Sequence, residues 1–122
     1  MKIKVSEASG PVLDWMVAKC EGAEFHCVDG VLCVLWSEEF DVRLTDYSPS
    51  TNWAQGGPIV EREKIEIRYY SQMIVAGTWY RDDIGSDECL HKSIGPTPLI
   101  AAMRCYVASK LGEEVEVPDD LI

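Results

Sequence analysis

The chain has 122 residues, the usual length of one domain, and its hydrophobic content of 47% is ordinary for a globular protein. Its 21 acidic and 11 basic residues give a net charge of −10, which disfavours direct binding to nucleic acid or anionic membranes because phosphate contacts need clustered Lys and Arg. No apolar run approaches the roughly 20 residues of a membrane span, so we expect one domain over residues 1–122 without a membrane segment.

The first half of the chain contains signals for strands and one helix. Residues Ile3–Val5 predict a short strand. Pro11 fits the first turn of a helix and Gly22 its end, and apolar residues recur at helical spacing between them. Val31–Trp36 is apolar on both faces, as in a central strand, whereas Asp41–Thr45 alternates and predicts an edge strand.

The second half predicts a β-hairpin, an acidic loop and a helix. The hairpin joins Ile65–Tyr70 to Met73–Arg81, and Asp82–Ser93 predicts the loop. In the helix after Thr97, the face opposite the large apolar residues is small, which suits burial against a second layer or a second subunit in a homodimer. Together the elements predict a single α+β domain with a small, mostly antiparallel sheet and two main helices.

The last helix has clear ends and one central charge. Thr97 is a good N-cap, Pro98 fits the first helical position, and Gly112 fits the C-terminal stop. Arg104 lies mid-helix and, if buried, needs an anionic partner. The sequence leaves two such partners open, an internal Asp or Glu and a bound anion.

The polar segment 46–58 is the candidate binding segment. It combines hydroxyl and amide side chains with aromatic rings for stacking and a glycine pair that lets a ligand approach the backbone. Pro58 predicts a short helix through Glu63, and the N-termini of this helix and of the last helix favour anions. The predicted ligand-binding residues are Tyr47, Ser50, Asn52, Trp53, Gln55, Gly56, Gly57, Thr97 and Arg104. The alternative interpretation is a capped structural loop that wraps a sheet edge.

No established catalytic or metal-binding motif occurs in the chain. It lacks a Walker loop, a G-x-G-x-x-G sequence and a G-x-S-x-G elbow, and neither histidine lies beside a nucleophile signature. The odd number of cysteines and the lack of a C-x-x-C pair favour free thiols in a reducing cytosol. His26–Cys27 and Cys89-x-His91 match no standard zinc spacing. We expect no metal and no cofactor, and the sequence leaves catalysis open without favouring it.

Three stretches of the chain carry a family resemblance: Leu13–Gly22, Tyr47–Glu61 and Thr97–Gly112. With the string S-P-S-T-N-W-A-Q-G-G-P inside the second stretch, the chain resembles the NinX family of small proteins from lambdoid phages and prophages. The resemblance implies a phage accessory protein made in the bacterial cytoplasm, and it implies no particular reaction.

The leading functional hypothesis is a non-catalytic module that binds a small anionic, nucleotide-like molecule and thereby sequesters a host signal. The first alternative is an acidic protein that binds and inhibits a host protein, such as a nucleic-acid enzyme, through Asp82, Asp83, Asp87 and Glu88. The second alternative is a hydrolase of a nucleotide-like compound.

Overall fold

The computed structural model describes residues 1–28, 31–37, 40–43, 47–81, 84–85 and 87–121. Its α-helices are α1 (Gly10–Cys20), α2 (Trp53–Arg62) and α3 (Pro98–Leu111). Its strands are β1 (Lys2–Lys4), β2 (Glu24–Val28), β3 (Val31–Ser37), β4 (Phe40–Arg43), β5 (Glu66–Tyr70), β6 (Met73–Arg81), β7 (Asp87–Gly95) and β8 (Glu114–Glu116). Short 3-10 helices are η1 (Val5–Glu7) and η3 (Asp119–Leu121).

The strands form separate antiparallel sheets rather than a single one. β1 pairs with β8, the order β2–β3–β4 makes a second sheet, and β5–β6–β7 makes a third. Neighbouring strands in the two larger sheets also follow one another in the sequence, so each of these sheets is a meander. The α+β class predicted from the sequence is therefore confirmed, with the strands divided among small sheets.

Most predicted elements are confirmed, and two differ. β3 is the central strand of its sheet, and Ser71–Gln72 is the turn between β5 and β6. The predicted acidic loop is wrong in its second part, because residues 87–95 form β7 along the whole length of β6. β7 is an outer strand, and such strands commonly carry charged residues. Helix α2 begins at Trp53 rather than at Pro58, which lies inside it.

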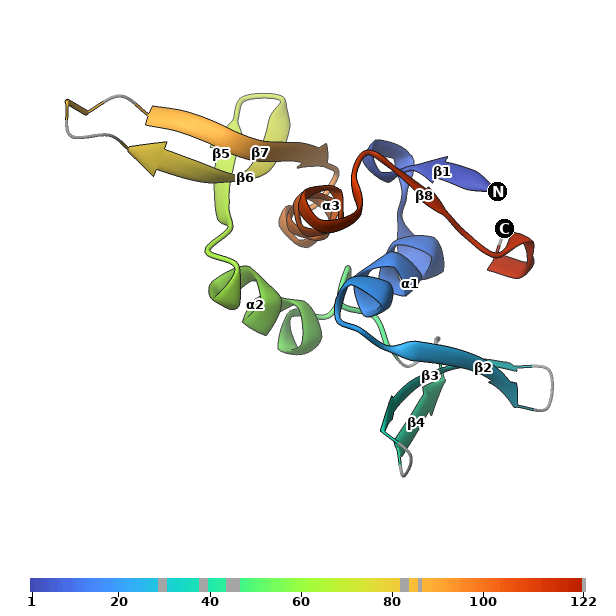
Figure 1. Ribbon diagram of the computed structural model, residues 1–122. Helices are drawn as coiled ribbons and strands as arrows, with labels where there is room; N and C mark the ends of the chain where they lie inside the picture. Colours follow the sequence, from blue (N-terminus) through green and yellow to red (C-terminus); the bar gives the residue numbers. More distant parts are fainter. Residues whose placement is uncertain (29–30, 38–39, 44–46, 82–83, 86, 122) are drawn as a thin grey trace.

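Helix α3 is the centre of the hydrophobic core. It packs against the β5–β6–β7 sheet, α1, α2 and η1, as Figure 1 shows. Most of its residues are apolar and buried, and Arg104 and Lys110 are its two charged residues, which is typical of a helix largely surrounded by its own protein. Its small face lies against β7, where a Cβ atom on Gly95 would stand 2.6 Å from the backbone nitrogen of Ala101. This part of the small face is thus covered within the chain, and the homodimer stays a prediction.

A polar cluster joins the three helices at one end. Glu21, which follows α1, accepts two hydrogen bonds from Arg62 of α2, of 3.0 Å from Nη1 and 2.7 Å from Nη2. The hydroxyl of Tyr106 in α3 donates to the same carboxylate at 2.6 Å. One carboxylate therefore fixes the relative position of α1, α2 and α3.

The helices in the described ranges are short. None of them combines the length and the apolar character that crossing a bilayer requires.

Candidate functional site

Several polar groups of residues 47–55 make hydrogen bonds that hold the segment in place, whereas the buried hydroxyl of Ser50 has no hydrogen-bond partner among the described residues. The Asp14 carboxylate of α1 accepts a bond of 2.9 Å from the backbone N–H of Ser50, and the side chain of Gln55 accepts one of 2.6 Å from Ser48. Asn52 is the N-cap of α2, because its side chain accepts from the backbone N–H of Ala54 at 2.9 Å. These contacts explain why helix α2 starts before Pro58.

The two glycines of α2 have different surroundings. A Cβ atom on Gly56 would collide with the carbonyl oxygen of Pro49 and would stand 2.7 Å from Cδ1 of Leu99 in α3. A Cβ atom on Gly57 would meet only the Trp53 ring, at 3.7 Å. Gly56 therefore permits a close approach between α2, the preceding loop and α3, whereas the sequence assigned both glycines to a ligand.

The two predicted stacking residues also differ in exposure. Tyr47 packs against the hydrophobic core, and burial raises the pKa of its hydroxyl. Trp53, at the first position of α2, is 52% exposed. Of the two rings, Trp53 is the one whose surface is open to solvent.

Arg104 binds neutral partners. Its Nε donates to the carbonyl oxygen of Ala8 at 2.8 Å, and its Nη1 donates to that of Ile94 at 2.9 Å. The sequence left an internal carboxylate or a bound anion as the partner, and within the described ranges no carboxylate forms an ion pair with this guanidinium. Partial burial lowers the pKa of Arg104. Its positive charge is therefore held in place by carbonyl oxygens, without an ion pair to any described carboxylate.

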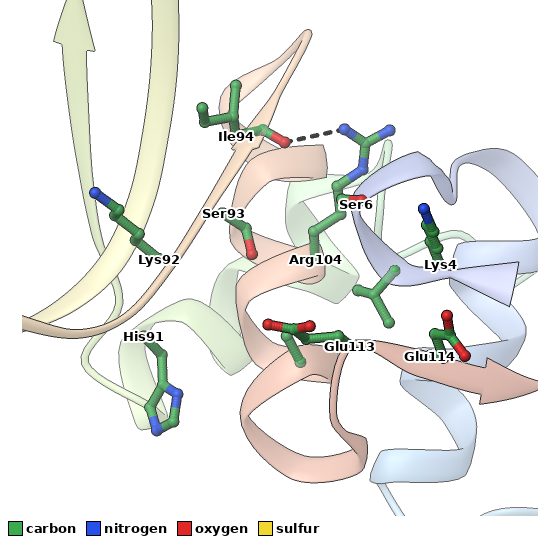
Figure 2. Close-up of a pocket in the computed structure, with 11 residues that line it drawn as sticks. Lys4, Ser6, His91, Lys92, Ser93, Ile94, Arg104, Glu113 and Glu114 are labelled. Atoms are coloured by element: carbon green, nitrogen blue, oxygen red, sulfur yellow. Dashed lines mark hydrogen bonds between the residues drawn. The ribbon is translucent and has the colours of Figure 1, made fainter.

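Arg104 lines a surface cavity of about 820 Å³ between α3, β7 and the β1–η1 segment (Figure 2). One wall consists of Lys4–Ser6 and the other of His91–Ile94; Arg104 and Ala108 come from α3, and Glu113 and Glu114 lie beyond the end of that helix. In Figure 2 the Arg104 side chain bridges the two walls beside Ile94 and Ser6. The cavity is thus built from three segments that are far apart in the sequence.

The cavity contains charges of both signs. Lys4, Lys92 and Arg104 are among its lining residues, although Figure 2 shows the Lys92 side chain extending away from Arg104. Glu113 and Glu114 supply the acidic groups. Such a cavity can hold an anionic group near Arg104 and accept hydrogen bonds from donor groups elsewhere on the same ligand.

Of the nine predicted ligand-binding residues, Arg104 alone lines this cavity. Leu99, which meets Gly56 of α2, and Arg104 are five residues apart, so they lie about 140° apart around the axis of α3. The 46–58 segment therefore approaches a different side of the helix from the one that carries the cavity. Thr97 is confirmed as the N-cap, since its hydroxyl accepts from the backbone N–H of Ile100 at 3.1 Å.

Sequence reasoning did not find the other lining residues. Lys4 and Ser6 lie near the start of the chain, while His91–Ser93 fall in the part that predicted a loop and Ile94 follows it. No local motif marks them, because only tertiary contacts bring these segments together. For Lys4, Ser6 and His91–Ser93, the polar side chain was the one signal that the sequence offered.

Two hypotheses depend on side chains outside the described part of the chain. These are the acidic cluster of Asp82, Asp83, Asp87 and Glu88, and the potential metal ligands His26 and Cys27. Among the side chains that the structure does describe, no three His, Cys, Asp or Glu residues converge as a metal site.

Comparison with known proteins identifies a family. No curated protein matches the chain at a significant level. The family model described as Bacteriophage P22, NinX matches residues 4–110, which include Arg104 and both walls of the cavity. Because this match covers most of the 122 residues, the chain belongs to the bacteriophage P22 NinX family.

Proposed function

We propose that this phage accessory protein is a non-catalytic binding module that holds an anionic group of its ligand at Arg104. The proposal depends on how the Arg104 guanidinium is hydrogen-bonded. Carbonyl oxygens fix Nε and Nη1, while Nη2 has no hydrogen-bond partner among the described residues. A guanidinium that is fixed and still has open N–H groups matches a carboxylate or a phosphate.

The charge and size of the cavity support the same function. Lys4 adds a second cation to the lining of the cavity, in a chain whose net charge is −10. The volume of about 820 Å³ lies within the range of roughly 300–1,000 Å³ that is typical of small-molecule sites. Glu113 and Glu114 favour a ligand that carries hydroxyl or amino donors besides its anionic group.

A nucleotide-like molecule has this combination of phosphate, hydroxyl and amino groups. Among the lining residues, His91 has the only ring on which a base could stack, and Tyr47 and Trp53 lie elsewhere. The lining residues therefore favour the anionic and hydroxyl groups of such a ligand rather than its base. In an infected bacterium, such a module would sequester an anionic signal molecule of the host.

Isothermal titration calorimetry with nucleotides, cyclic nucleotides and inorganic phosphate tests the proposal. We expect binding in the micromolar range to at least one of them, weakened about tenfold or more by Arg104→Met, because a hydrogen bond to a charged group contributes about 1.5–3 kcal/mol. Lys4→Met should weaken binding too, and this second variant leaves the internal hydrogen bonds of Arg104 intact.

The matched control is Lys2→Met, which removes one positive charge from β1 outside the cavity. It should change the affinity by less than about twofold. If none of these compounds binds, the proposed small-molecule function is wrong, and if the three variants weaken binding equally, Arg104 is not the group that holds the anion. Mass spectrometry of the bound compound tests the non-catalytic part, because conversion of the ligand would show an enzyme.

A further inference from the structure

One wall of the Arg104 cavity is the open edge of a sheet. β7 is the outer strand of the β5–β6–β7 sheet, and within the described ranges no backbone hydrogen bond joins it to a segment other than β6. The Ile94 carbonyl accepts from Arg104, so it points out of the sheet and toward the cavity. Backbone groups of alternate residues face the same edge, and Lys92 therefore presents its N–H and C=O there as well. Such an edge is a template for an additional strand.

A second hollow, of about 310 Å³, lies across β7 from this cavity, and its lining is mainly apolar. Lys92 and Ile94 line both hollows, which are thus neighbours on the same strand. Ile94 is 51% exposed, and Tyr70 and Met73 of the second hollow are 55% and 45% exposed. This side of the sheet therefore offers apolar contacts beside the polar edge of β7.

An added strand would contact both hollows at once. Successive side chains of a strand point to opposite faces of the sheet. A peptide paired with the Lys92–Ile94 edge would direct one set of side chains toward α3 and Arg104, and the other set along the outer face beside Ile94. Arg104 forms no ion pair among the described residues, and its guanidinium therefore selects an acidic side chain in the first set, whereas Lys4 lies opposite Glu114 in the β1–β8 pair.

We propose that the free edge of β7 binds an extended segment of a partner protein, with an Asp or Glu side chain at Arg104 and apolar side chains two residues apart on the outer face. The inference rests on the proposed function, because the carboxylate occupies the same anion site. It adds that the backbone of the ligand pairs with the N–H and C=O of Lys92 and with the N–H of Ile94 as a fourth strand of the sheet, while the Ile94 carbonyl keeps its hydrogen bond from Arg104.

Selection from a displayed library of random octapeptides tests the inference. Peptides that also bind the Arg104→Met variant are removed before peptides that bind the wild type are collected. We expect enriched peptides in which one acid is flanked by apolar residues at a spacing of two. Synthetic copies with the acid changed to its amide should bind about fivefold or more weakly. Ile94→Thr alters an exposed side chain and should lower the affinity of the same peptides by about fivefold.

Backbone methylation distinguishes strand addition from other modes of binding. Two series of peptides carry N-methyl groups on alternate residues. In one series the methylated nitrogens are those whose N–H groups would face β7, and in the other they are those whose N–H groups would face away from it. One series should abolish binding, and the other should change it by less than about threefold. In ¹⁵N spectra, the amide signals of Lys92 and Ile94 should shift when the unmethylated peptide is added.

The outcomes separate this inference from the proposed function. If phosphate or nucleotides bind in an Arg104-dependent manner and no peptide is enriched, the proposed function stands and the peptide site is wrong. If both methylated series bind, strand addition is wrong. If the chain alone forms a dimer that the selected peptides dissociate, the occupant is a second copy and the assignment to a partner protein is overturned. If neither class of compound binds, both proposals fail.

Discussion

Nη1 of Arg104 in α3 donates a 2.9 Å hydrogen bond to the carbonyl oxygen of Ile94, at the edge of β7. Nε of the same side chain donates to Ala8, just after η1, at 2.8 Å. The candidate anion site is therefore also a structural link between the two walls of the cavity. This double role means that binding and stability must be measured separately for every substitution at position 104.

Arg104→Met should lower the free energy of unfolding by about 1–3 kcal/mol, because two carbonyl oxygens lose a charged donor while the apolar stem is kept. Urea denaturation at neutral pH measures this loss. Lys92→Met is the matched control: Lys92 is exposed and forms no hydrogen bond or ion pair among the described residues, so a change below about 0.5 kcal/mol is expected. Equal stability of the two variants would contradict the structural link.

Gly56→Ala and Gly57→Ala should have opposite effects. The new methyl group at position 56 would collide with Pro49 and Leu99, and such overpacking costs about 1–3 kcal/mol. At position 57 the new methyl group makes only an ordinary contact, and Ala is favoured over Gly inside a helix by about 0.5–1 kcal/mol. Thermal unfolding of both variants checks the prediction, and a destabilised Gly57→Ala variant would show that α2 is packed differently.

Asp14 should make a pH-dependent contribution to stability. Burial raises the pKa of this carboxyl above its ordinary value of 3.8, and this effect exceeds the opposite effect of hydrogen bonding with Ser50. At a pH between the pKa of Asp14 in the unfolded chain and its pKa in the folded protein, the folded protein holds a proton on Asp14 that the unfolded chain has lost. The contribution of Asp14 to the free energy of unfolding therefore rises as the pH falls through this window.

Asp14→Asn isolates that contribution, because every other carboxyl is common to the two proteins. Urea denaturation between pH 7 and pH 4 should show the wild type gaining stability relative to Asp14→Asn as the pH falls. A difference that is constant with pH would contradict the raised pKa. Asp14→Ala should cost about 1–3 kcal/mol at any pH in this range, since it leaves the buried N–H of Ser50 without an acceptor.

Tyr106→Phe should lower the free energy of unfolding by about 1–3 kcal/mol. The substitution keeps the buried ring and removes the hydroxyl that donates to Glu21, the carboxylate shared by the three helices. Tyr69→Phe is the control, because Tyr69 is 69% exposed and the same change there should cost less than about 0.5 kcal/mol. Similar losses for both variants would show that the cluster contributes little.

The α+β class and the ends of α1 and α3 follow from local rules of the chain. Thr97 caps α3 with its side chain, and Gly112 follows that helix with a φ of +90°, a conformation that suits glycine. The β5–β6 hairpin likewise follows from the alternation of Ile65–Tyr70, the β-forming residues of Met73–Arg81 and the two residues between them. Such features depend on residues within a few positions of one another, and the sequence alone therefore determines them.

Tertiary structure decided which candidate residues meet. Composition marked residues 46–58 as a binding segment, yet several of their polar groups hydrogen-bond to one another and to Asp14, and Gly56 accommodates Leu99. The cavity that contains Arg104 instead joins Lys4–Ser6 to His91–Ile94. The side of α3 that faces each segment depends on how the helix is packed in the core, and no local pattern of residues encodes that rotation.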